Sequence, residues 1–175
     1  MSKIIRDGTI VVDDWAALSA DDTLSLPSHQ DAPRLIVPLK VWQLRREEFL
    51  ARDGQLGLLL QTDDEPAPIG VDVSLFNLIA IHFAKFTDGR GYSLARLLRE
   101  RYRYTNELRA TGDVLQDQLF YLKRSGFNAF AIRTDKNIDG ALKSLNDFSK
   151  QFHVHNKYPL KKKPLTSIKR LVGVV

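Results

Sequence analysis

The sequence predicts an α/β protein built on a parallel sheet. Strand-like runs recur at short intervals, at residues 35–37, 56–60, 79–83, 107–111 and 127–132. Most are followed by a segment in which apolar residues have helical spacing, and polar loops come directly after the strands. This alternation favours parallel strands joined by right-handed crossovers. We expect about five βα units in an open sheet that resembles part of a TIM barrel; a flat, doubly wound three-layer sheet is the alternative.

Residues 1–33 are expected to form an N-terminal extension. The dipeptide Asp7-Gly8 lies between two apolar stretches and predicts a β-hairpin. Trp15 and Leu18 are the apolar side chains that would anchor this segment on the main body.

A single α/β domain is expected over residues 34–150. Its first helix is predicted over residues 40–52, and the strand at 79–83 leads to the best-defined helix. Ser93 is a suitable N-cap for that helix, and apolar side chains at helical spacing follow it. Asp113 and Gln116 predict a capping box for the next helix, which ends at Ser125-Gly126. A last helix is predicted from residue 138.

The charge of the chain is unevenly distributed. The net charge is +5, but residues 151–175 hold six basic and no acidic side chains. The remaining residues carry 20 basic and 21 acidic side chains. Residues 151–175 are therefore predicted to be a basic tail, and the body has no excess of positive charge for binding nucleic acid.

The absence of cysteine excludes disulfides, thiolate zinc sites, cysteine-bound iron–sulfur clusters and thiol catalysis. The chain has no nucleotide-binding fingerprint, so we expect no flavin, nicotinamide or other cofactor, and the four histidines suggest no metal site. No apolar run is long enough for a membrane helix and the first residues do not resemble a secretory signal. These features predict a cytoplasmic protein without membrane contact.

The first candidate site is the loop that contains Asp88-Gly89-Arg90-Gly91. The two glycines permit close approach of the backbone to a ligand, and Ser93 is expected at a helix start with free amide groups. Lys85 and Arg90 add positive charge, so the loop suits a small oxyanion or a phosphorylated ligand. The alternative interpretation is a tight turn closed by a pair between Asp88 and Arg90.

The second candidate segment contains Arg109, Asp113, Asp117 and Gln118. Arg109 lies on a predicted strand and is expected to join the anion site, with Asp117 and Gln118 as supporting residues. Asp113 is either a helix cap or, like Asp88, a catalytic acid or base. Because polar loops of parallel sheets meet at the carboxyl ends of the strands, both segments are expected at that edge.

These segments carry a resemblance to a known family. The runs FTDGRGYSLARLLR at residues 86–99, ELRA at 107–110 and GDVLQDQ at 112–118 resemble the bacterial family called domain of unknown function 934. The resemblance is dense over residues 78–132 and looser over 34–77. Asn106 stands where a glycine is expected, and the basic tail is not a recognised family feature.

The resemblance implies a probable oxidoreductase associated with sulfite reduction. Since a sulfite reductase needs an iron–sulfur cluster held by thiolates, we expect an accessory protein of assimilatory sulfite or sulfate reduction rather than the reductase. Its expected partners are an oxyanion and sulfite reductase or another sulfur-assimilation protein. One alternative is a small TIM-like enzyme acting on a phosphorylated or carboxylated metabolite. Another is a non-catalytic docking module that uses the arginines of the helix over residues 93–103.

Overall fold

The computed structural model describes residues 2–18 and 32–151, with side chains described as far as residue 145. The side chains of the predicted basic tail lie outside this part of the chain. No helix within the described residues has both the length and the apolar character that crossing a membrane requires.

The described strands form one eight-stranded sheet with the order β2-β1-β8-β7-β6-β5-β4-β3. They are β1 Lys3–Arg6, β2 Thr9–Val12, β3 Ala16–Ala17, β4 Arg34–Pro38, β5 Gln55–Gln61, β6 Leu78–Phe83, β7 Glu107–Gly112 and β8 Ala129–Phe130. Strands β3 to β8 are parallel, whereas β1 is antiparallel to both β2 and β8. The sheet is therefore mixed, which corrects the expectation of a purely parallel one. The hairpin predicted at Asp7-Gly8 is present, and it extends the sheet beyond β8.

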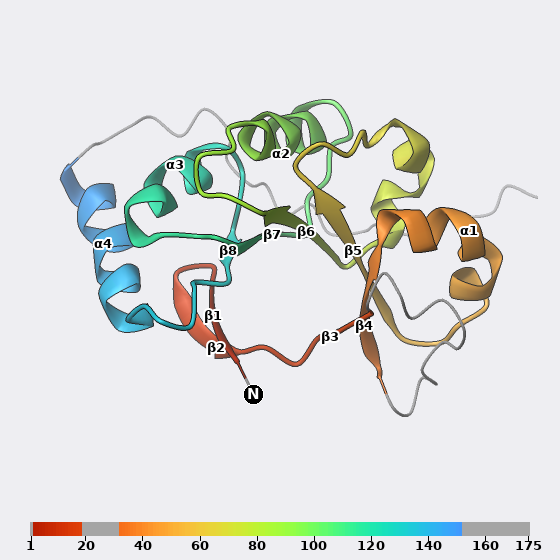
Figure 1. The fold of residues 1–175 in the computed structure, drawn as a ribbon, viewed down its shortest axis with the longest axis horizontal. Coiled ribbons are helices and arrows are strands. Elements are labelled where there is room, and N and C mark those ends of the chain that lie inside the picture. The colour runs from red at the N-terminus through yellow and green to blue at the C-terminus, as the bar shows by residue number, and fades with distance from the viewer. Residues whose placement is uncertain (1, 19–31, 152–175) are drawn as a thin grey trace, which may run out of the picture.

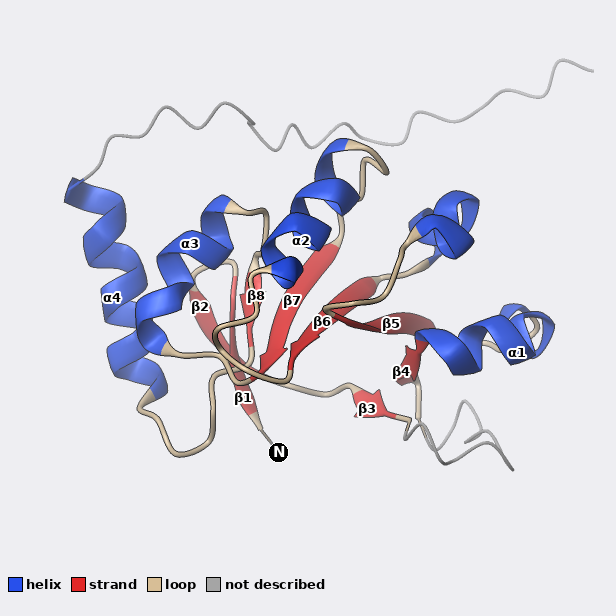
Figure 2. Cartoon of the chain, turned by 45° about the horizontal axis from the view of Figure 1, so that its top comes forward, coloured by secondary structure: helices blue, strands red, loops and turns tan. Residues whose placement is uncertain are grey.

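The helices cover the outer face of this sheet (Figures 1 and 2). The α-helices are α1 Leu39–Leu50, α2 Arg90–Glu100, α3 Leu119–Arg124 and α4 Ile138–Gln151, and the 3-10 helices are η1 Ala67–Leu75 and η2 Gln116–Gln118. The main core fills the space between the helices and the sheet and includes Val37, Leu58, Ile81, Leu108 and Phe130.

The sheet curls into a half-barrel, and the connection between its two edge strands explains why. Strand β2 ends at Val12 and strand β3 begins at Ala16, so three residues join opposite edges of the sheet. That connection spans at most about 14 Å, whereas seven strand spacings in a flat sheet would separate the edges by about 34 Å. The flat alternative is therefore not adopted, and the connecting segment crosses the open side of the half-barrel (Figure 1).

The concave face carries a second, smaller apolar cluster. Ile36, Leu78 and Ala80 are buried there, and Trp15 packs on them from the connecting segment. Gly57 makes this possible, because a Cβ atom at that position would lie 3.1 Å from the Trp15 ring.

Two predicted helix starts are wrong. Helix α2 begins at Arg90 with Gly89 at the N-cap, so Ser93 lies inside the first turn. The Asp88 carboxylate accepts the Arg90 backbone N–H at 3.1 Å, which starts the helix earlier than the Ser93 hydroxyl would. Asp113 caps no helix, since it binds the backbone of Phe86 instead.

Candidate functional site

The loop before α2 is organised around the Asp88 carboxylate. Arg90 donates from Nε at 3.0 Å and from Nη2 at 2.7 Å, and the Thr62 hydroxyl donates at 2.6 Å. The Arg90 hydrogen bonds, and then that of Thr62, lower the pKa of Asp88 far below its usual value. Asp88 is therefore ionised at neutral pH and offsets the Arg90 charge, as in the alternative interpretation of this loop.

The other residues predicted in this loop have different surroundings. Lys85 is exposed and makes no ion pair with any described residue. A backbone hydrogen bond from Asp88 N to Lys85 O, at 3.1 Å, holds it near the Asp88–Arg90 pair. A Cβ on Gly89 would meet nothing within 4 Å, whereas Gly91 is packed against Phe83.

The second segment fixes the first loop. The Asp113 carboxylate accepts the Phe86 N–H and the Arg133 Nη1–H, each at 3.0 Å. Gln118 donates from Nε2 to the Phe86 carbonyl oxygen at 2.6 Å. The Phe86 amide, then Arg133, lower the pKa of Asp113. Carboxylates with lowered pKa values are weak bases, so neither Asp88 nor Asp113 is suited to acid/base catalysis at neutral pH.

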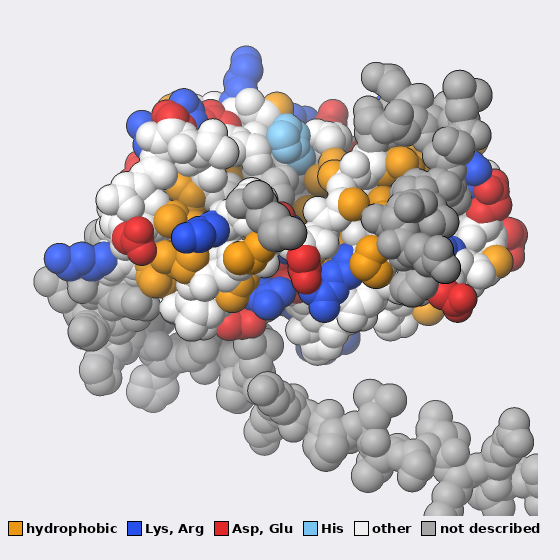
Figure 3. Space-filling view, turned by 90° about the horizontal axis from the view of Figure 1, so that it is seen from below, with side chains coloured by type: hydrophobic (Ala, Val, Ile, Leu, Met, Phe, Trp, Pro, Cys, Tyr) orange, Lys and Arg blue, Asp and Glu red, His pale blue; other side chains and the backbone are white. Residues whose placement is uncertain are grey.

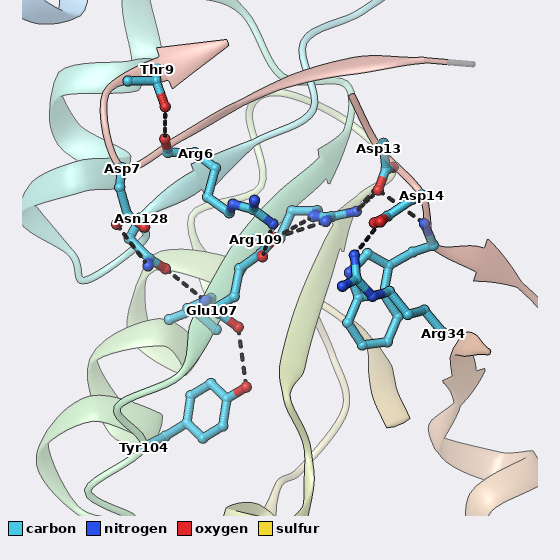
Figure 4. Close-up of polar contacts among 12 residues, drawn as sticks. Arg6, Asp7, Thr9, Asp13, Asp14, Arg34, Tyr104, Glu107, Arg109 and Asn128 are labelled. Atoms are coloured by element: carbon cyan, nitrogen blue, oxygen red, sulfur yellow. Dashed lines mark hydrogen bonds and ion pairs between the residues drawn. The ribbon is translucent and has the colours of Figure 1, made fainter. Parts of the chain in front are cut away.

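Of two further members of the predicted site, Asp117 lies near the start of α2, whereas Arg109 lies apart from it. Asp117 is exposed in η2, where its charge, after the larger effect of burial, helps to raise the pKa of Tyr92. Arg109 projects from the middle of β7, in register with Ala80 and Ala129, and is only 2% exposed. It contacts Asp13 and Glu107, so the structure does not bring it together with Lys85 and Arg90 (Figure 4).

Arg109 belongs to a charged network on the concave face. We use "strap" for residues Asp13, Asp14 and Trp15, which connect the edge strands. Asp13 accepts two hydrogen bonds from Arg109 Nη1, and Asp14 pairs with Arg34. Glu107 binds Arg109 and lies 3.4 Å from Arg6 Nη1. Each of these three arginines thus has a carboxylate partner, and the network of three arginines and three carboxylates is neutral.

A groove on the outer face presents arginines that have no such partners. It has a volume of about 460 Å³ and lies between α2, which contributes Tyr92, Ser93 and Arg96, and the end of α3, which contributes Tyr121, Arg124 and Ser125. Arg96 and Arg124 make no ion pair within the described part of the chain, and the Arg124 guanidinium lies 5.7 Å from the centre of the Phe120 ring. Tyr92 also lines the groove, and burial, followed by the charge of Asp117, raises its pKa above the usual value near 10; its phenol is therefore neutral at pH 7 and can donate.

Of the residues that line this groove, Ser93 and the arginines of one helix were predicted to be functional from the sequence, whereas Arg124 was not. The missing signal is topological. Consecutive right-handed βα units place their helices side by side, so polar residues on the facing sides of α2 and α3 meet in space although neither helix alone indicates it.

A second cavity lies on the concave face, at the amino ends of the parallel strands. It has a volume of about 340 Å³ and is lined by Arg6, Trp15, Arg34, Gln55, Asn77, Asn106 and Glu107. Gln55 and Glu107 are the first residues of β5 and β7, and Asn77 directly precedes β6. The sequence pattern predicts an anion site at the opposite, carboxyl edge of the sheet and does not predict this cavity.

Comparison with known proteins identifies a family. No curated protein matches the sequence. The model of a family described as bacterial proteins of unknown function, DUF934, matches residues 57–161, which is more than half of the chain. The match begins within β5 and includes the loop before α2, the groove-forming helices and α4. The chain therefore belongs to the bacterial family called domain of unknown function 934.

Proposed function

We propose that this protein is an accessory protein of assimilatory sulfite or sulfate reduction that binds a small oxyanion in the groove between α2 and α3. The main support for the anion site is that Arg96 and Arg124 line the same groove and neither has a carboxylate partner among the described residues. The resemblance carried by the runs at residues 86–118 supports the role in sulfite reduction.

The balance of charge favours the groove over the loop before α2. In the loop, Asp88 offsets Arg90, and only Lys85 adds net charge. In the groove, two guanidinium groups and the hydroxyls of Ser93 and Tyr121 surround one space. Charge-assisted hydrogen bonds from guanidinium to an oxyanion are the strong class of hydrogen bond, so the groove offers more binding energy. The site stays close to the predicted one, since Ser93 lies in the first turn of α2.

Calorimetric titration with sulfite, sulfate and phosphate at low ionic strength tests the anion site. The substitutions Arg96→Ala and Arg124→Ala should each weaken binding by about tenfold or more, on the ~1.5–3 kcal/mol scale of hydrogen bonds to charged groups. Arg90→Ala is the matched control, because Arg90 is an exposed arginine of the same helix that is already paired. No measurable binding by the parent protein, or an equal loss in all three variants, would remove the groove as the site.

A docking module for sulfite reductase is the second candidate. Tyr121 is 61% exposed next to the groove arginines, and exposed tyrosine with arginine is typical of protein interfaces. Arg101 and Arg103 are also exposed just beyond α2. A variant with Arg101→Glu and Arg103→Glu should weaken binding of purified sulfite reductase in surface plasmon resonance and leave sulfite titration unchanged. Unchanged reductase binding would argue against this surface.

A further inference from the structure

We propose that the cavity on the concave face binds a neutral, planar small molecule with hydrogen-bonding edges, of which nucleobases are the commonest example. This site is separate from the proposed oxyanion site, because the groove between α2 and α3 lies on the outer face of the sheet. The cavity volume of about 340 Å³ is within the usual range for a small-molecule site.

The charges around the cavity exclude a strong preference for anions. Arg34 is paired with Asp14, and Glu107 is held by Arg109, whose Nε donates to it at 2.8 Å. Arg6 lies 3.4 Å from the same glutamate. Figure 3 shows acidic and basic side chains next to one another on this side of the molecule. An anion would have to compete with these carboxylates for each arginine.

The groups left for a ligand are neutral carboxamides. The side chains of Gln55 and Asn77 line the cavity and have no hydrogen-bond partner among the described residues. Their backbones are fixed, since Gln55 N donates to Pro33 O at 2.9 Å and Asn77 N donates to Leu56 O at 2.8 Å. Asn106 uses Nδ2 to bind the Phe76 carbonyl oxygen at 2.9 Å, which leaves its Oδ1 as an acceptor. A carboxamide carries a donor and an acceptor in one plane and matches the edge of a base or amide.

Trp15 supplies an apolar wall beside these groups. Its ring packs on Ile36, Leu78 and Ala80 and is held against Gly57. A fixed indole favours stacking with a flat ring, and such stacking on aromatic side chains is tolerant of the identity of the base. Planar edges and a flat wall together select a heterocycle rather than a flexible chain.

Tryptophan fluorescence of the full chain tests this proposal directly. Trp42 is 1% exposed on the other face of the sheet and gives a constant background. Adenosine and uridine should therefore quench the Trp15 signal with saturation, and benzoate, a planar anion, should not. Asn77→Ala and Gln55→Ala should each weaken nucleoside binding by about three- to tenfold.

Gln43→Ala is the control, because Gln43 is an exposed carboxamide on α1 outside the cavity. The affinity of the Gln43→Ala variant for each nucleoside should equal that of the parent protein. Three results would overturn the proposal: no saturable quenching by either nucleoside, tighter binding of benzoate than of the nucleosides, or parental affinity in both cavity variants. Sulfite titration of the same variants distinguishes the cavity from the groove, since neither cavity substitution should change the affinity for sulfite.

Discussion

Arg109 donates from Nη1 to both carboxylate oxygens of Asp13, at 3.0 Å each, although the two residues are 96 positions apart (Figure 4). Asp13 belongs to the strap that joins the two edge strands, and Arg109 projects from β7 near the middle of the sheet. This pair therefore fastens the strap across the open side of the half-barrel.

Replacing Asp13 with Ala should strongly destabilise the protein. Arg109 is 2% exposed, so the substitution leaves a buried guanidinium with Glu107 as its remaining partner. Removing one partner of a buried ion pair typically lowers the free energy of unfolding by about 3–5 kcal/mol. Chemical denaturation measures this loss.

The matched control is Asp14→Ala on the same strap. Its partner Arg34 has a side chain that is 38% exposed, and exposed ion pairs contribute only about 0–1 kcal/mol. Similar losses in the two variants would contradict the view that the buried pair, and not the strap's charge in general, fastens this segment.

Gly57→Ala should loosen the strap from the other side. The added Cβ would lie 3.1 Å from both the Trp15 ring and Ile36 Cγ1, and overpacking of this kind costs about 1–3 kcal/mol. Gly89→Ala is the control, because its Cβ would meet nothing within 4 Å and its φ of −70° suits alanine. Thermal melts should show a lowered midpoint for Gly57→Ala alone; an unchanged midpoint would mean that Trp15 is not held on Gly57.

The Asp88–Arg90 pair predicts a titration that can be observed at one residue. The Arg90 hydrogen bonds are the largest cause of the lowered pKa of Asp88, followed by that of Thr62. Carbon-13 NMR of the Asp88 carboxyl should give a midpoint below the usual 3.8, and Arg90→Ala should raise it towards that value. The same midpoint in parent and variant would show that Arg90 does not hold this carboxylate.

This shift also sets the direction of the pH effect on stability. A carboxyl whose pKa is lower in the folded protein stabilises it above the unfolded pKa, near 3.8, and this contribution is lost as the pH falls below that value. Denaturation of Asp88→Asn at several pH values should therefore show a weaker acid dependence than the parent protein. An equally steep fall would assign the acid sensitivity to other carboxyls.

The sequence predicts most of the helices and of the strands that they cover. This is because the spacing of apolar residues indicates which side chains pack between a helix and the sheet. The predicted strand over 79–83 and helix over 40–52 correspond closely to β6 and α1. The pairing of β1 with β8 cannot be predicted from the local sequence pattern of either strand. It depends on residues such as Ile5 and Phe130, which are 125 positions apart and pair across the sheet.

The candidate site was harder to predict for the same reason. The loop before α2 was predicted as a site because many polar residues lie close together in its sequence. Their closeness in the sequence does not reveal which charged residues neutralise each other. Arg90 and Asp88 do so locally, and Arg109 does so with Asp13 from the other end of the chain. The unpaired arginines, Arg96 and Arg124, look in the sequence like ordinary solvent-facing helix residues.

Anomalous diffraction from crystals soaked in selenate tests the proposed oxyanion site most directly, since selenate has the shape and charge of sulfate and its selenium can be located. We predict an anomalous peak between the Arg96 and Arg124 guanidinium groups, near the Ser93 hydroxyl, that is absent from crystals of the Arg96→Ala, Arg124→Ala double variant. A peak beside Lys85 and Arg90, or no peak in the groove of the parent protein, would contradict the account.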